Sequence, residues 1–243
     1  MSRALATSGR VLAQLRRDPR TIALLLGVPV LMMGLLRLIY ARRIAVFDVV
    51  GAPLLSLFPL FTMFLVTSVA VLRERTTGTL ERLLTTPLAK LELLGGYGIA
   101  FGLAAAVQAT LAAGAALGPL GLDVAGLPLL VVMLCVAVAL LGMGLGLLAS
   151  AFAQTEFQVV QFFPAMILPQ LLLCGLLVPR SRMPAALHAI SDFLPMSYAV
   201  DAMRHLSRQA SASGALWGDL AVVLVFALAA IAIGAVTLRR RTD

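Results

Sequence analysis

Charged side chains are scarce in this sequence. Only 12% of its 243 residues are Asp, Glu, Lys or Arg, whereas 61% are hydrophobic. Soluble domains average about 25% charged and about 45–50% apolar residues. So few polar residues cannot cover the surface of a water-soluble protein of this length. The composition therefore excludes an ordinary soluble domain and indicates a protein that crosses a membrane several times.

Enzyme motifs are also missing. The single lysine, Lys90, follows alanine rather than glycine, so the sequence has no phosphate-binding loop of the form G-x-x-x-x-G-K-[ST]. The pattern H-E-x-x-H is absent, and both histidines, His188 and His205, lie in one predicted loop. No G-x-S-x-G serine stands near a histidine within an apolar segment. We therefore predict no catalytic, cofactor-binding or metal site in this chain, and we do not expect it to be an enzyme.

Acidic residues are rare as well, and none lies in the middle of an apolar segment. All eleven fall in predicted loops or near segment ends. Carriers driven by ion gradients usually keep ionisable groups within their spans, so an ion-coupled secondary transporter is disfavoured. The two cysteines, Cys135 and Cys174, lie in apolar runs and are expected to be buried, not paired or metal-bound. The N-terminus lacks the pattern of a cleaved signal peptide.

Apolar segments long enough to cross a membrane are what the sequence has in abundance. A helix needs about 20 apolar residues to cross about 30 Å of hydrocarbon. Six segments have this length: residues 21–39, 49–72, 93–117, 127–151, 159–178 and 215–238. We therefore expect an all-α membrane protein with six transmembrane helices, whose transmembrane domain comprises residues 21–238.

The distribution of positive charge predicts how these helices are oriented. An even number of spans places both termini on one side, and twelve of the nineteen Lys and Arg residues fall there. Positively charged loops stay in the cytoplasm, so we expect a plasma (inner) membrane protein with cytoplasmic termini and a basic tail at residues 239–243. The arginines border the apolar segments. The net charge of +8 thus reflects arginines that orient the protein in the membrane lipid, and no nucleic-acid partner is expected.

Two further segments are too short to span but are partly apolar. Residues 1–20 place leucines along one face and arginines around the other, which predicts a cytoplasmic amphipathic helix lying on the membrane interface. A frayed basic tail is the alternative. Residues 179–213 are half apolar and interrupted by Pro184 and Pro195, which favours short re-entrant or interfacial helices on the outer side. A solvated loop is the alternative there.

One compact charged segment, residues 73–92, separates the second and third spans. Gly78 is positioned as a helix N-cap with Glu81 three residues later, and Leu80 and Leu83 share one face of the helix that follows. Pro87 ends this helix, so it comprises about residues 79–86. A helix of about two turns is unstable alone. It therefore needs a packing surface, either on its own bundle or on a partner, unless it is an ordinary solvated loop helix.

This segment resembles the cytoplasmic segment of ABC-2 type transporter permeases, written roughly E-R-x-x-G-T-L-E-x-L-x-x-x-P. The matching residues are Glu74, Arg75, Gly78, Thr79, Leu80, Glu81, Leu83 and Pro87. The second half of the chain is similar to the fifth span and outer loop of that family, including its late L-P-x-x-Y pattern. Here those residues are Leu194, Pro195 and Tyr198. The resemblance covers about residues 20–240.

The resemblance implies a mechanism and a set of partners. Two permease subunits, identical or merely similar, pair in the membrane. Each binds a separate cytoplasmic ATP-binding subunit, so ATP and Mg²⁺ are expected on two copies of that partner. The helix at residues 79–86 becomes a coupling helix in a groove of the ATPase, with Glu74, Glu81 and Arg82 as polar contacts, braced by the N-terminal helix.

The resemblance also implies that the second and fifth spans line the transport pathway. The pathway candidates are Phe58, Phe61, Phe64, Gln158, Gln161, Phe162 and Phe163. Helix packing is the alternative role for these aromatic residues. Only about ten residues separate the first two spans, as in drug and glycan exporters of the family. The aliphatic spans favour a hydrophobic or amphipathic, drug-like or lipid-like substrate, with polysaccharide or glycolipid export as the alternative.

Overall fold

The computed structural model describes residues 3–77, 90–211 and 213–237. These residues form helices and short connections, without a strand in the described ranges. The helices are α1 (Arg3–Arg16), α2 (Pro19–Ile39), α3 (Ile44–Thr76), α5 (Lys90–Leu117), α6 (Pro128–Phe152), α7 (Glu156–Leu173), the 3₁₀ turn η1 (Arg180–Arg182), α8 (Ala185–Asp192), α9 (Pro195–Arg208) and α10 (Gly214–Thr237). Six of them, α2, α3, α5, α6, α7 and α10, are long and apolar enough to cross a membrane. The predicted all-α, six-span architecture is confirmed.

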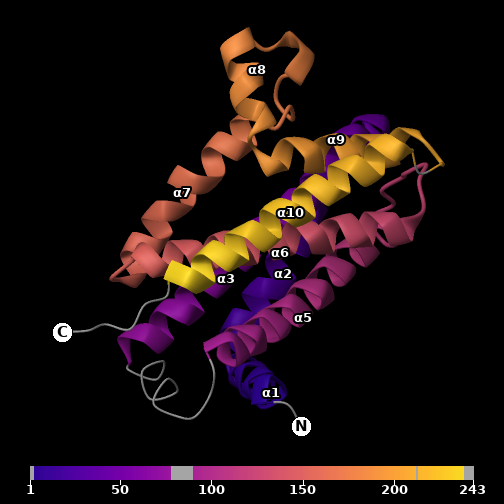
Figure 1. Cartoon of the computed structure of the whole chain (residues 1–243). Helices are drawn as coiled ribbons and strands as arrows, with labels where there is room; N and C mark the ends of the chain where they lie inside the picture. Colours follow the sequence, from indigo (N-terminus) through magenta and orange to yellow (C-terminus); the bar gives the residue numbers. More distant parts are fainter. Residues whose placement is uncertain (1–2, 78–89, 212, 238–243) are drawn as a thin grey trace.

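The long helices form a bundle with two distinct ends (Figure 1). We call one the α1 end, where α1, the last turn of α3 and the first turns of α5 and α7 lie. The other, the α9 end, carries α9 and the α5–α6 connection, in which Gly126 N–H donates to Leu206 O at 2.8 Å. The predicted helix at residues 79–86 and the tail at 239–243 lie outside the described residues.

Local chemistry sets where several helices begin and end. Asp18 caps α2 by accepting hydrogen bonds from Thr21 N–H at 3.2 Å and from the Thr21 hydroxyl at 2.7 Å. Helix α7 ends at Leu173, five residues before the predicted end of this span at residue 178. Gly175 adopts φ +88°, a conformation that side chains disfavour, and this breaks the helix. Cys135 and Cys174 are buried and unpaired, as expected.

Helix α6 lies at the centre of the bundle, between α3 and α10. Glycines on opposite faces allow both neighbours to approach its backbone closely. A β-carbon at Gly146 would lie 2.5 Å from the carbonyl oxygen of Phe64 in α3, and one at Gly144 would lie 3.0 Å from the carbonyl oxygen of Ala227 in α10. Gly142 meets the Leu60 backbone of α3 in the same way. The close helix contacts that these glycines permit are therefore made within the chain.

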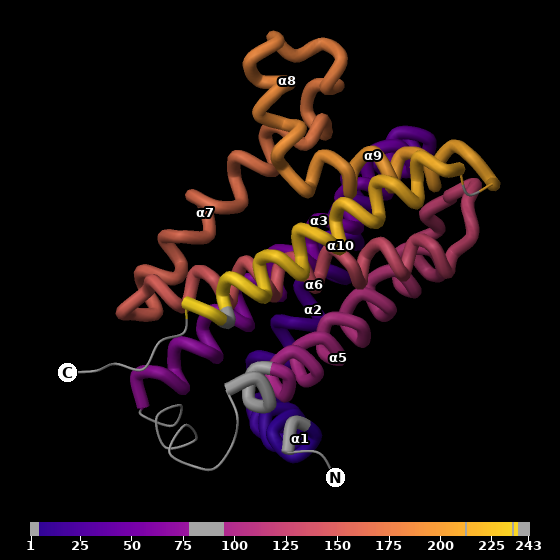
Figure 2. Tube along the Cα trace, viewed as in Figure 1, coloured from indigo at the N-terminus to yellow at the C-terminus, as the bar shows by residue number. Residues whose placement is uncertain are grey.

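Helix α7 stands at the periphery and leads to a small outer substructure (Figures 1 and 2). Its exposed apolar side chains include Phe157, which is 71% exposed, and Leu172, which is 53% exposed. The tube in Figure 2 shows α7 diverging from α10 and continuing into the segment that contains α8. Helix α7 thus presents an apolar face that no other described part of this chain covers.

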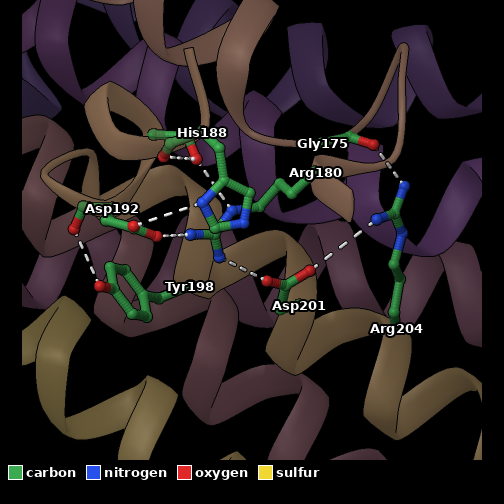
Figure 3. A network of polar contacts seen from close by, with 8 residues as sticks. Gly175, Arg180, His188, Asp192, Tyr198, Asp201 and Arg204 are labelled. Atoms are coloured by element: carbon green, nitrogen blue, oxygen red, sulfur yellow. Dashed lines mark hydrogen bonds and ion pairs between the residues drawn. The ribbon is translucent and has the colours of Figure 1, made fainter. Parts of the chain in front are cut away.

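A polar network centred on Arg180 holds together the segment from Gly175 to Arg208, which contains η1, α8 and α9 (Figure 3). The Arg180 guanidinium donates to Ser191 Oγ at 3.0 Å and to Asp201 Oδ2 at 2.9 Å, and it also pairs with Asp192. Arg204 donates to the carbonyl oxygen of Gly175 at 2.6 Å, which ties α9 to the break after α7. Two short packed helices, α8 and α9, therefore occupy the segment where short helices were predicted, in place of an irregular loop.

Candidate functional site

Three consecutive charged residues, Arg73, Glu74 and Arg75, form the last turn of α3 at the α1 end. They stand directly before residues 78–89. Successive residues of an α-helix point about 100° apart, so these three side chains reach different elements. We call Arg73–Arg75, together with the groups they bind, the α3 terminal cluster.

Glu74 faces inward and pairs with α1. Its side chain is only 8% exposed, and its Oε1 atom is 3.3 Å from Nη1 of Arg10. Arg10 donates a second hydrogen bond, of 3.2 Å, to the hydroxyl oxygen of Tyr97 in α5. Within the described residues the other carboxylate oxygen, Glu74 Oε2, is buried without a hydrogen-bond partner. The carboxylate therefore joins α3, α1 and α5, while one of its oxygens is left unsatisfied.

Arg75 binds the end of α6. Its Nη1 donates to the carbonyl oxygen of Ser150, and it lies 3.5 Å from that of Ala153. The last carbonyls of a helix have no partner within the helix, and they carry partial negative charge that a cation stabilises. Arg75 thus caps α6 from a neighbouring helix and fixes the end of α3 to the central helix of the bundle.

Arg73 contacts α7 through a bidentate ion pair with Glu156. Its Nε lies 2.6 Å from Oε1 of Glu156 and its Nη2 lies 3.3 Å from Oε2. Both side chains are more than half exposed, so this pair contributes at most about 1 kcal/mol to stability. Because Glu156 opens the first turn of α7, the pair couples the position of α3 to that of α7.

The partners in this cluster are distant in the sequence and could not be predicted from it. Arg10 lies 64 residues from Glu74 and Tyr97 lies 87 residues from Arg10, and no local spacing connects them. One signal was available: a carboxylate at the end of an apolar helix needs a countercharge when it is buried. The predicted contact residues Gly78, Thr79, Leu80, Glu81, Arg82, Leu83 and Pro87 lie outside the described residues.

The pathway candidates lie where α3 faces α7. Phe163 packs edge-to-face against Phe61 and Phe64, with ring centroids 5.4 Å and 5.7 Å apart. Such aromatic pairs contribute about 0.5–1.5 kcal/mol beyond their burial. Phe64 is fully buried, so this part of the set packs α7 onto α3.

The other candidates differ in exposure. Phe58 and Phe162 are partly buried against the core, and Gln158 accepts a 2.7 Å hydrogen bond from Gln154 N–H. Gln161 is exposed on α7. Only Gln161 therefore presents its side chain on the uncovered face of that helix.

Comparison with known proteins places this architecture in a family. Residues 4–207 match the family model described as "ABC-2 type transporter". The chain is 27% identical over 172 residues to "Probable multidrug ABC transporter permease YbhR" of Escherichia coli, covering 71% of this chain and 47% of that protein. It is 29% identical over 162 residues to "Probable multidrug ABC transporter permease YbhS" of the same organism, covering 66% and 41% respectively.

A eukaryotic relative, "ABC transporter G family member 20" of Dictyostelium discoideum, is 28% identical over 141 residues, covering 58% of this chain and 19% of that protein. The chain thus matches less than half the length of each of these three relatives. The family match, in contrast, extends from α1 through α9 and includes the α3 terminal cluster. This chain therefore belongs to the ABC-2 type transporter family.

Proposed function

We propose that this chain is the transmembrane permease subunit of an ATP-driven exporter that moves a hydrophobic or amphipathic substrate out across the plasma membrane. In this proposal the α1 end faces the cytoplasm, and residues 79–86 dock into a separate ATP-binding subunit. Hydrolysis of Mg·ATP on that partner displaces the docked segment.

The α3 terminal cluster is the observation that carries this proposal. The charged residues at the end of α3, shortly before the proposed docking segment, contact α1 through Glu74, α6 through Arg75 and α7 through Arg73. Arg10, the partner of Glu74, extends this contact to α5 through Tyr97. A force on the segment would therefore reach four elements within one helical turn. Because Glu74 is buried against Arg10, we assign it the transmission of this force, and we assign contact with the ATPase to Glu81 and Arg82.

The exposed apolar face of α7 supports a second permease subunit as a partner. Helix α7 exposes Phe157, Val160, Gln161 and Leu172. We place a second copy, or a similar chain, against this face, so that α3 and α7 of the two subunits enclose the pathway. The complete exporter then contains two permeases and two ATP-binding subunits.

The substrate class follows from the relatives and from the composition of the spans. Two relatives carry names that describe multidrug permeases, and the spans of this chain are rich in aliphatic residues. An amphipathic or hydrophobic, drug-like substrate is consistent with both observations.

Substitutions in the docking segment, one that reverses a charge and one that places a charge on the apolar face, test the proposal. Glu81→Lys and Leu83→Asp should each reduce two measured quantities by about tenfold or more. These are the amount of P-loop ATPase recovered with the tagged chain and the substrate-stimulated rate of ATP hydrolysis. The reason is that contacts at the centre of an interface contribute about 2 kcal/mol or more. Asp123→Lys is the matched control: it reverses an exposed charge at the α9 end and should leave both quantities unchanged.

Two results would overturn the proposal. One is normal ATPase recovery and coupling in both docking-segment variants. The other is transport by the purified chain alone in proteoliposomes, driven by an ion gradient without ATP.

A further inference from the structure

A groove with a volume of about 390 Å³ opens between α1, α2, α3 and α5. Its volume lies in the range of about 300–1,000 Å³ that is usual for small-molecule sites. Aliphatic side chains form most of its wall, including Leu24 and Val28 of α2 and Leu65, Val66 and Val69 of α3. Leu24 is 61% exposed, so the wall on the α2 side is open toward the surroundings of the bundle. In a membrane this groove faces lipid.

The groove has a depth and a polarity that match one membrane leaflet. Along α3 its lining runs from Thr62 to Glu74, which is a rise of about 18 Å at 1.5 Å per residue. The hydrocarbon core of a bilayer is about 30 Å thick, so one leaflet contributes about half of that. The polar lining residues Gln14, Asp18, Arg73 and Glu74 gather at the α1 end of the groove. An apolar shaft with a polar mouth therefore spans one leaflet.

Charges of both signs line the mouth, and one of these residues carries an unsatisfied oxygen. Arg73 and the carboxylates of Asp18 and Glu74 all line it. Both oxygens of Asp18 already accept hydrogen bonds from Thr21. Glu74 Oε2, by contrast, is buried without a partner among the described residues. A buried carboxylate oxygen without a donor is unfavourable, so a ligand that brings an N–H group to this position is stabilised.

We propose that this groove binds one phospholipid with a primary ammonium headgroup, of the phosphatidylethanolamine class, from the leaflet at the α1 end. One acyl chain lies along Val28, Leu65 and Val69. The ammonium group donates a hydrogen bond to Glu74 Oε2. The phosphate faces Nη1 of Arg73, because Nε and Nη2 of that guanidinium bind Glu156. A choline headgroup has no N–H to donate, and a glycerol headgroup brings no positive charge to the carboxylates. This inference rests on the proposed function only for the orientation of the chain, which makes the leaflet at the α1 end the inner leaflet.

Photolabelling in nanodiscs tests this site. The full chain is reconstituted in phosphatidylcholine nanodiscs with a trace of phosphatidylethanolamine that carries a diazirine in one acyl chain, and the labelled peptides are mapped by mass spectrometry. We expect labelling on α2 and α3 around Val28 and Val69. Unlabelled phosphatidylethanolamine should reduce the labelling of the groove at about one tenth of the concentration that phosphatidylcholine or phosphatidylglycerol requires. This factor is expected for one hydrogen bond to a charged group.

Two variants separate the shaft from the headgroup contact. Val28→Trp fills the shaft and should abolish labelling, whereas Val225→Trp, at an exposed position of α10 outside the groove, should leave labelling unchanged. Glu74→Gln should retain labelling but lose the preference for phosphatidylethanolamine over phosphatidylcholine.

Equal competition by phosphatidylcholine in the wild type, or labelling outside the groove, would overturn the inference. So would labelling that Val28→Trp leaves intact. ATPase coupling is not measured in this experiment, so its outcome is independent of the test of the proposed function.

Discussion

The pair between Glu74 and Arg10 allows a quantitative test of the α3 terminal cluster. Arg10→Met removes the cation and leaves the Glu74 carboxylate buried without its partner. Removing one member of a fully buried pair destabilises a protein by about 3–5 kcal/mol. The Arg10 side chain is 35% exposed, so water replaces part of the interaction. We therefore expect a loss of about 2 kcal/mol, which corresponds to a melting temperature lower by about 4–8 °C for a chain of this length.

The double-mutant cycle isolates the interaction between the two side chains. Glu74→Gln should destabilise by only about 1 kcal/mol, because Arg10 remains partly hydrated. The double variant Arg10→Met, Glu74→Gln should then be less destabilised than the sum of the single variants, by about 1 kcal/mol or more. Thermal denaturation of the purified chain in one detergent, followed by fluorescence-detected size exclusion, gives all four values.

Arg16→Met provides the control, because Arg16 is exposed on the same helix. Exposed substitutions away from specific contacts stay within about 0.5 kcal/mol of the wild type. Strictly additive single effects would refute the reasoning. So would an Arg10→Met variant as stable as Arg16→Met.

Three further predictions concern packing, topology and pH. Gly146→Ala places a β-carbon 2.5 Å from Phe64 O and should destabilise the bundle by about 1–3 kcal/mol in thermal denaturation, whereas Gly98→Ala, with no atom within 4 Å of the added carbon, should not. Thr77→Cys should react with a membrane-impermeant maleimide in inside-out vesicles but not in intact cells; labelling of intact cells would invert the orientation. The hydrogen bonds from the Thr21 side chain and backbone lower the pKa of Asp18 from its ordinary value of 3.8. The stability from this cap is therefore complete above that value and is lost as pH falls through the folded pKa. The melting temperatures of the wild type and Asp18→Ala should accordingly differ at pH 7 and converge as the pH falls below 3.8.

The number of spans could be predicted from the sequence because length and apolar composition decide whether a helix can cross a membrane. Their ends could not be predicted as well. Helix α3 continues to Thr76, beyond its predicted end at residue 72, because polar residues extend a helix where they find partners, as Arg73, Glu74 and Arg75 do. Helix α7 ends early, at Leu173, because Gly175 adopts a backbone conformation that interrupts the helix although the apolar run continues.

The candidate site shows the limit of sequence reasoning. The motif around Glu74 and Arg75 predicts a coupling segment, and that role stays a prediction. The contacts of this turn with Arg10 and the α6 carbonyls, and the further bond from Arg10 to Tyr97, depend on packing between distant helices. The sequence leaves two roles open for the aromatic residues of α3 and α7, which are helix packing and lining of the transport pathway. The edge-to-face contacts of Phe163 account for packing, and a role in the pathway stays a prediction.

The glycine faces of α6 have a mechanical consequence. Where backbone touches backbone, no side-chain rotamer can change to absorb a shift, and close-packed interiors transmit strain. Gly142 and Gly146 hold α3 on one face of α6, and Gly144 holds α10 on the other. We therefore expect these three helices to move together as one body. Helices α2 and α7 are the least buried spans, so we expect motion during transport to occur there, and the ion pair of Arg73 with Glu156 then joins this body to a helix that moves against it.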